Sequence, residues 1–106
     1  MYELDKNQVK QILLEEYHYP LYQINVFLDT LHSFNDIFRP VIEQWLKDRR
    51  ISDIEVEDLT IQKVMKTRMC SFLTAVRDLN ILMDKNLSPE QHDTFKKYLQ
   101  QPVMRM

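Results

Sequence analysis

Apolar residues recur at helical spacing along most of the chain. The clearest run places Ile24, Phe27 and Leu28 at i, i+3 and i+4, with Leu31 at i+7, and predicts a helix over Leu21 to His32. Similar runs, bounded by proline or by capping residues, predict further helices. These are expected over Asp5 to Tyr17, Ile37 to Arg49, Ile61 to Arg68, Ser71 to Asn86 and Pro89 to Gln100.

The start signals of the last three helices are the most specific. Thr60 and Ser71 are placed as N-caps, where a side-chain oxygen accepts a backbone N–H of the first turn. Ser88, Pro89 and Gln91 follow the pattern of a capping box with proline at the first helical position.

One segment departs from helical spacing. Ile51, Ile54 and Val56 alternate with acidic residues, so Arg50 to Asp58 is expected to be extended, with a lone short strand around Ile51 to Glu57. The rest of the pattern predicts an all-α fold, a compact bundle of five or six short helices.

The composition supports helices because the chain contains no glycine, where about seven would be average. Phosphate-cradling loops, dinucleotide fingerprints and nucleophile elbows need glycine for close backbone approach or positive φ, so these chemistries are excluded. Tight hairpins of the primed type are also disfavoured without glycine.

A length of 106 residues is typical of one domain. We therefore expect a single helical domain over residues 1–106, with residues 103–106 forming a frayed C-terminal tail after Pro102. Trp45 is expected near the centre of the core. The other predicted core residues are Ile24, Phe27, Leu28, Leu31, Ile42, Leu46, Val64, Phe72, Val76, Leu79 and Phe95.

The lone cysteine, Cys70, cannot form an internal disulfide, and the N-terminal residues are too polar for an export signal. A cytoplasmic location is expected. No apolar run approaches the roughly 20 residues that cross a bilayer, so no membrane partner is expected. The net charge is −2, with acidic residues in excess before residue 60 and basic residues in excess after it.

The middle of the chain carries a run that begins at Phe38 and includes Trp45-Leu46, the acidic alternation from Ile51 to Glu57, and Leu59 to Met65. This run resembles a family of small, mostly helical bacterial proteins of unassigned function, in which a similar run follows an N-terminal helix and a Tyr-x-Tyr segment like Tyr17 to Tyr19. This chain departs from that pattern because it lacks a glycine around Arg49 to Asp58. The resemblance implies no catalytic or binding residue.

Residues that could carry catalysis or hold a metal are scattered. The three histidines have no i, i+4 pairing, and no Cys or carboxylate set has metal-ligand spacing. Glu15 and Glu16 are adjacent on a helix and so face different directions, which argues against an acid/base pair. We therefore expect no metal, no cofactor and no enzymatic activity.

Two non-enzymatic functions remain. The first is a protein-interaction module: a small adaptor, regulator or inhibitor that presents a helical surface to another protein. Self-association into a homo-oligomer is left open. Its first candidate contact is an acidic segment that could meet a basic partner. Its second is an aromatic set, because Tyr side chains bring a large contact area at low entropic cost. These residues are Asp53, Glu55, Glu57 and Asp58, and Tyr17, Tyr19 and Tyr22.

The alternative is a helix-turn-helix regulator that binds nucleic acid through residues 60–85. Its candidate phosphate contacts are Lys63, Lys66, Arg68 and Arg77. The acidic pI near 5.9 and the modest density of basic residues rank this alternative second.

Overall fold

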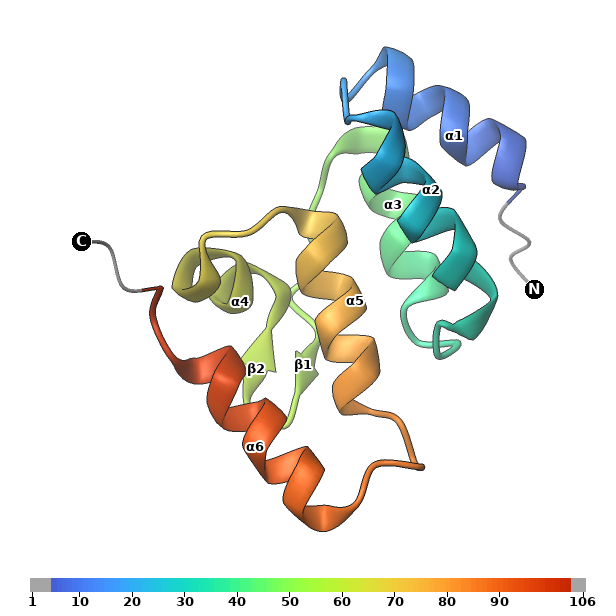
Figure 1. Ribbon diagram of the computed structural model, residues 1–106. Coiled ribbons are helices and arrows are strands. Elements are labelled where there is room, and N and C mark those ends of the chain that lie inside the picture. Colours follow the sequence, from blue (N-terminus) through green and yellow to red (C-terminus); the bar gives the residue numbers. More distant parts are fainter. Residues whose placement is uncertain (1–4, 104–106) are drawn as a thin grey trace. The chain divides into compact units, whose positions relative to one another are not determined.

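The computed structural model describes residues 5–103 and consists mainly of helices (Figure 1). Within those residues, six α-helices, one 3₁₀-helix and a two-stranded sheet follow one another along the chain. The predicted all-α fold of five or six short helices is therefore confirmed. The elements are α1 (Lys6–Glu15), α2 (Leu21–Thr30), the 3₁₀-helix η1 (Leu31–Ser33), α3 (Arg39–Asp48), β1 (Glu55–Val56), β2 (Leu59–Thr60), α4 (Ile61–Arg68), α5 (Phe72–Leu82) and α6 (Pro89–Gln100).

The chain divides into two compact units, Met1–Ile51 and Ser52–Met106. The first contains α1 to α3, and the second contains the two strands and α4 to α6. The expectation of a single domain over residues 1–106 stays a prediction.

In the first unit, local signals set where the helices begin and end. The Asp5 side chain accepts the Asn7 N–H at 2.8 Å and so caps α1, and Pro20, in extended conformation, directly precedes α2. Pro40 lies in the first turn of α3, where its missing N–H costs no hydrogen bond. Helix α1 contacts both α2 and α3. The buried apolar residues of this unit are Val9, Leu13, Ile24, Phe27, Leu28, Leu31, Phe34, Phe38, Val41, Ile42, Trp45 and Leu46.

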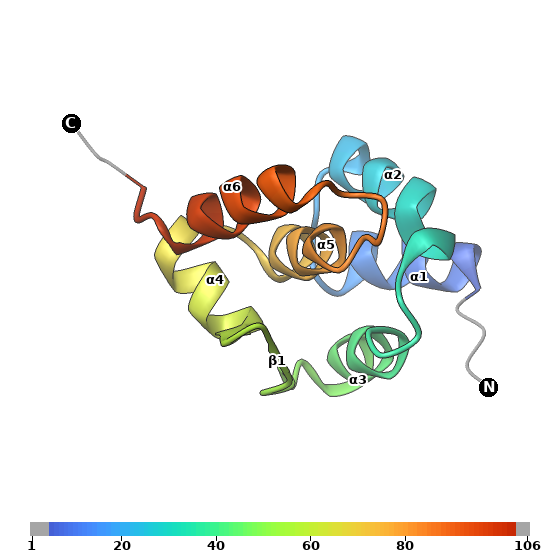
Figure 2. The same cartoon turned by 90° about the horizontal axis from the view of Figure 1, so that it is seen from below.

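In the second unit, α4, α5 and α6 contact one another (Figures 1 and 2). The predicted N-caps are confirmed, since Thr60 accepts from the Lys63 N–H and Ser71 from the Thr74 N–H. The capping box at Ser88 is confirmed in both of its hydrogen bonds. The buried apolar residues of this unit are Val56, Leu59, Ile61, Val64, Phe72, Leu73, Ala75, Val76, Leu79, Leu82 and Leu99.

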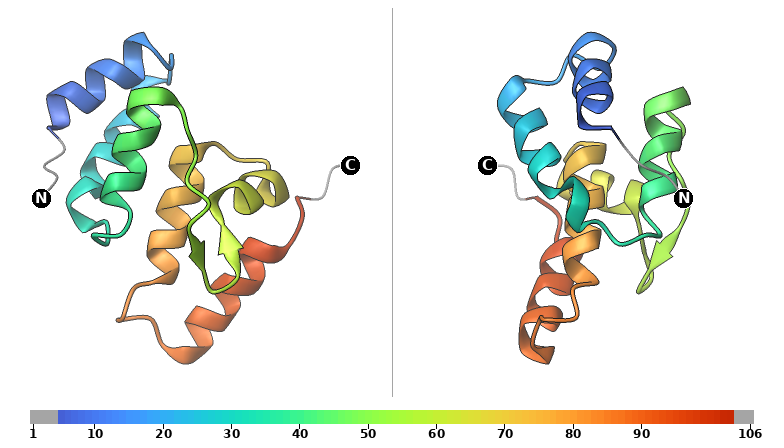
Figure 3. Two further views of the ribbon diagram at one scale, coloured as in Figure 1. Left: turned by 180° about the vertical axis from the view of Figure 1, so that it is seen from behind. Right: turned by 90° about the vertical axis from the view of Figure 1, so that its right-hand side faces the viewer.

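The acidic segment forms a hairpin, so the expectation of a lone strand is wrong. Strand β1 pairs antiparallel with β2, with Val56 opposite Leu59, and β2 leads directly into α4 (Figure 3). The two turn residues, Glu57 and Asp58, have φ of 50° and 71°, the left-handed backbone that primed turns require. The expectation that the lack of glycine disfavours such a turn is therefore also wrong. Aspartate is among the residue types that accept this backbone more readily than most, which applies to Asp58 and not to Glu57.

Trp45 and ten of the other eleven predicted core residues are buried, and Phe95 is the exception. Phe95 is half-buried because its ring lines an open groove between α5 and α6. Three α-helices end at least two residues earlier than expected: α1 at Glu15, α2 at Thr30, where η1 follows, and α5 at Leu82. Of the predicted frayed tail, Val103 donates its N–H to the Thr67 carbonyl at 3.2 Å, and residues 104–106 lie outside the described part of the chain.

Candidate functional site

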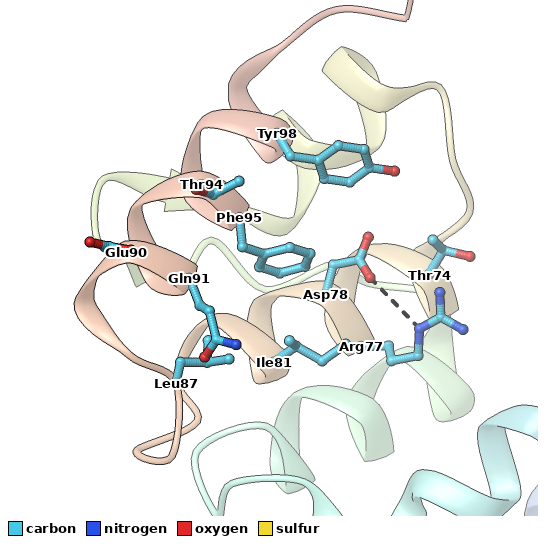
Figure 4. A pocket seen from close by; sticks show the side chains of 10 residues that line it. All are labelled: Thr74, Arg77, Asp78, Ile81, Leu87, Glu90, Gln91, Thr94, Phe95 and Tyr98. Carbon is cyan, nitrogen blue, oxygen red and sulfur yellow. Dashed lines mark ion pairs between the residues drawn. The ribbon is translucent and has the colours of Figure 1, made fainter.

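A concave surface of the second unit lies between α5 and α6 and is here named the α5–α6 groove (Figure 4). It is open along one side and encloses about 820 Å³. Its lining residues are Thr74, Arg77, Asp78, Ile81, Leu87, Glu90, Gln91, Thr94, Phe95 and Tyr98.

Helical spacing brings these side chains to the groove. On α5, Thr74, Asp78 and Ile81 stand at i, i+4 and i+7, so they follow one stripe of the helix. On α6, Gln91, Thr94, Phe95 and Tyr98 stand at i, i+3, i+4 and i+7. Leu79 and Leu82 of α5 and Leu99 of α6 are buried next to these stripes, and α5 contacts α6. The two stripes therefore face each other.

Asp78 is the most unusual residue of the groove, since it is ionisable yet only 8% exposed. Its ion-pair partner is Arg77, whose Nε lies 3.7 Å from Asp78 Oδ1. That distance is longer than a hydrogen bond, and Arg77 Nε is buried without a hydrogen-bond acceptor. Burial raises the pKa of Asp78 above its ordinary 3.8, although the positive charges of Arg77 and Arg68 oppose the rise. The carboxyl group is therefore desolvated without full compensation.

The rest of the groove is largely apolar. Ile81 is 38% exposed there, and Figure 4 shows the Phe95 ring of α6 directed toward α5, next to Asp78. The rings of Phe95 and Tyr98 stack with their centroids 5.8 Å apart. The Arg68 guanidinium lies 4.0 Å from the centroid of the Tyr98 ring and donates to the Gln101 carbonyl, which holds Tyr98 in place. The groove thus combines an aromatic wall with one buried carboxyl group.

The predicted acidic segment lies on the hairpin, and all four of its residues, Asp53, Glu55, Glu57 and Asp58, are exposed. Glu57 is engaged within the unit: its Oε2 lies 2.5 Å from His92 Nε2 and its Oε1 lies 3.8 Å from Lys96 Nζ, both on α6. These contacts fasten the turn to α6 and partly neutralise the charge offered to a partner.

The predicted aromatic set lies in the first unit. Tyr17 stacks on Trp45, with 4.3 Å between centroids, and donates its hydroxyl to the Trp45 carbonyl. Tyr19 meets Trp45 edge to face, with 6.2 Å between centroids. Burial raises the pKa of Tyr17 above 10.0, with Arg49 opposing the rise. Tyr22 is 68% exposed and carries most of the aromatic surface that a partner could reach.

The four basic candidates separate into two pairs. Lys63 and Lys66 are exposed on α4, and Lys63 Nζ donates to the Asp58 carbonyl at 3.4 Å. Arg68 is held by the Tyr98 ring and the Gln101 carbonyl, and Arg77 is paired with Asp78. Three of the four predicted phosphate contacts, Lys63, Arg68 and Arg77, therefore have partners within the protein.

Among residues 5–103 no three His, Cys, Asp or Glu side chains gather as metal ligands. Cys70 is half-buried, and burial together with the charge of Asp78 raises the pKa of its thiol, which makes it a weaker nucleophile. Within the same part of the chain no helix is long and apolar enough to cross a bilayer.

Asp78 was not among the predicted site residues, although its position in the sequence carries a signal. Asp78 stands three residues after Ala75 and four before Leu82, on the apolar face of α5. A carboxylate at such a position is uncommon, because buried charges need partners. This position could have been selected from spacing alone.

Comparison of the chain with protein-family models, with curated proteins and with solved structures finds no match. The resemblance of residues 38–65 to a family of small helical bacterial proteins therefore stays a prediction.

Proposed function

We propose that this protein is a non-enzymatic interaction module that binds a segment of another protein in the α5–α6 groove. The observation that carries the proposal is an open, largely apolar groove on which Ile81 stays exposed beside a buried carboxyl group. Exposed apolar surface in a concave site is typical of a binding surface.

The openness of the groove favours a protein segment over a small metabolite. Sites for small molecules bury most of the ligand surface, which a groove open along one side does not do. An amphipathic helix, by contrast, places one apolar face in a groove and leaves its polar face in water. The facing stripes of α5 and α6 offer apolar contacts along such a helix.

The acidic hairpin and Tyr22 are proposed as secondary contacts. Asp53, Glu55 and Asp58 are exposed without an ion pair among the described residues, so their charges are available to a basic partner. Rim charges of this kind act on association rate more than on affinity. We therefore assign the main binding energy to the groove.

The proposal is tested by affinity purification of the tagged protein from the lysate of its own organism, with quantitative mass spectrometry. Ile81→Glu places a charge on the groove, and Val26→Glu places one on the first unit at a residue with 47% exposure, against 38% for Ile81. A stoichiometric protein captured by the wild type and by Val26→Glu, but lost with Ile81→Glu, supports the proposal.

Two outcomes would overturn it. A partner that binds both variants equally does not use the groove. Capture that disappears after nuclease treatment, falls steeply with salt and is lost on joint substitution of Lys63 and Lys66 by Glu would replace the proposal with the nucleic-acid alternative.

A further inference from the structure

We infer that the exposed face of α2 is a self-association surface, on which two copies of this chain pair through antiparallel α2 helices about a twofold axis near Val26. The surface lies in the first unit, so the inference goes beyond the proposed function and does not depend on the α5–α6 groove. It starts from three side chains of α2, here named the α2 stripe: Tyr22, Val26 and Asp29.

Helical spacing places the α2 stripe on the solvent side of the helix. Its residues stand at i, i+4 and i+7, and each residue of a helix advances by about 100°, so the stripe lies opposite the buried residues of α2. Tyr22 is 68% exposed, Val26 is 47% exposed and Asp29 is exposed as well. Polar and charged residues normally occupy this side of a surface helix. The exposed Tyr22 and Val26 are therefore typical of a binding surface.

The chain around the stripe carries almost no charge. No Asp, Glu, Lys or Arg occurs from Tyr17 to Leu28, although 28% of the residues of the whole chain are charged. Charged residues are depleted and Tyr is enriched at the centre of protein interfaces. In a twofold interface the same patch meets itself, so every charge on it faces a copy of the same patch. A nearly neutral patch meets that condition, and a second copy is the occupant that it fits.

The one charge on the stripe favours the antiparallel orientation. With the axis beside Val26, the two Val26 side chains meet, and Asp29 of each copy lies beside Tyr22 of the other copy. Asp29 has no ion pair among the described residues. The Tyr22 hydroxyl accepts a bond from the Gln23 side chain at 3.3 Å and keeps its own O–H to donate to a carboxylate. Parallel pairing would instead place the two Asp29 carboxylates opposite each other, which is unfavourable.

The start of α2 favours the same orientation. Pro20 precedes the helix, and no side chain of residues 5–103 caps it, so the N–H groups of its first turn are open to an acceptor. Antiparallel pairing brings the Asp29 carboxylate of the other copy toward this positive end of the helix. By symmetry each contact occurs twice in the dimer.

The size of the surface predicts a weak dimer. Stable interfaces engage roughly 20–30 residues on each side, whereas α2 has ten residues in all. We therefore expect a Kd of about 0.1–1 mM. Sedimentation equilibrium and NMR diffusion of the full chain, from about 20 μM to about 2 mM, measure this Kd. The amide signals of the α2 stripe should shift with concentration over the same range.

Charge substitutions at Val26 test both the surface and its axis. Val26→Glu and Val26→Lys should each raise Kd at least about tenfold, because two equal charges then meet across the axis. An equimolar mixture of these two variants should associate at least as tightly as the wild type, because opposite charges then meet. Ile81→Glu is the matched control: it adds the same charge to the second unit at an exposed apolar residue and should change Kd less than about twofold.

Asp29→Asn tests the orientation. In the antiparallel dimer it removes the charge that the Tyr22 hydroxyl and the helix start of the other copy meet, so Kd should rise about fivefold. Tyr22→Phe removes the hydroxyl donor and should raise Kd by a similar factor. In a parallel dimer Asp29→Asn would relieve repulsion and lower Kd, so the sign of the change distinguishes the two orientations.

The inference is overturned if the chain stays monomeric up to about 2 mM, or if Val26→Glu and Ile81→Glu raise Kd equally. Failure of the mixed Val26 variants to associate, or tighter association of Asp29→Asn, overturns the antiparallel pairing about Val26. Because capture of another protein is tested at Ile81 and self-association at Val26, the proposed function and this inference can fail separately.

Discussion

Tyr17 connects the end of α1 to α3 through two separable contacts, a ring stack and a hydrogen bond. Its ring lies on Trp45, with 4.3 Å between centroids, and its hydroxyl donates to the Trp45 carbonyl. The substitution Tyr17→Phe removes the hydroxyl and keeps the ring. It therefore measures the hydrogen bond alone.

The expected cost follows from what the Trp45 carbonyl retains. This carbonyl also accepts the Arg49 N–H at 2.8 Å, so the substitution does not leave it without a partner. The larger penalty for an unsatisfied buried acceptor is then avoided, and the loss should be about 1 kcal/mol, near the average for one hydrogen bond. That value corresponds to roughly a fivefold rise in the unfolding constant.

Urea unfolding monitored by fluorescence provides the assay, because Trp45 is the sole tryptophan and the stacking partner of Tyr17. The midpoint should fall by roughly 0.5–1 M urea with an unchanged slope. Tyr22→Phe is the matched control: Tyr22 is 68% exposed, and its hydroxyl accepts a bond only from the exposed Gln23 side chain. That change should cost less than about 0.5 kcal/mol. Equal effects of the two substitutions would refute the assignment.

The pKa of Tyr17 adds a second signature. Because burial raises this pKa in the folded state, stability from the protonated hydroxyl is complete below pH 10.0 and is lost as pH rises through the folded pKa. The difference in stability between wild type and Tyr17→Phe should therefore shrink above pH 10.0. A difference that stays constant across that range would show that the hydroxyl is not the group responsible.

Two further predictions concern the second unit. Burial raises the pKa of Asp78, so the folded state holds this proton more tightly and wild-type stability falls as pH rises from 3.8 through the folded pKa. Asp78→Asn should remove that fall, so its stability relative to wild type should be greater at pH 7 than near pH 4. If urea unfolding of the variant shows the same pH dependence as the wild type, the prediction is contradicted. Met69 ends α4 in left-handed conformation (φ 52°) and is 54% exposed. Met69→Gly should therefore raise stability by up to about 1 kcal/mol in thermal unfolding. Lys66→Gly, inside the same helix, is the control and should lower stability by a similar amount. A loss of stability in Met69→Gly would mean that the exposed side chain contributes more than the backbone strain costs.

The sequence by itself determined the features that depend on neighbours a few residues away. The caps at Thr60, Ser71 and Ser88 were predictable because each joins a side chain to a backbone N–H three residues later. Ten buried residues of the helices were predictable because a helix buries whichever face its apolar spacing defines.

Tertiary structure alone decided the features that join distant segments. The glycine-free turn at Glu57 and Asp58 has a strained left-handed backbone, and contacts from Glu57 to His92 and Lys96, about 35 residues further on, offset that strain. Phe95 was expected in the core, yet it lines an open groove because α6 leaves a gap along α5. The bonding of Asp78 likewise depends on what α6 and Arg68 place around it. Helical spacing shows that Asp78 lies on an apolar face; only the packing of three helices determines that this face opens into a groove.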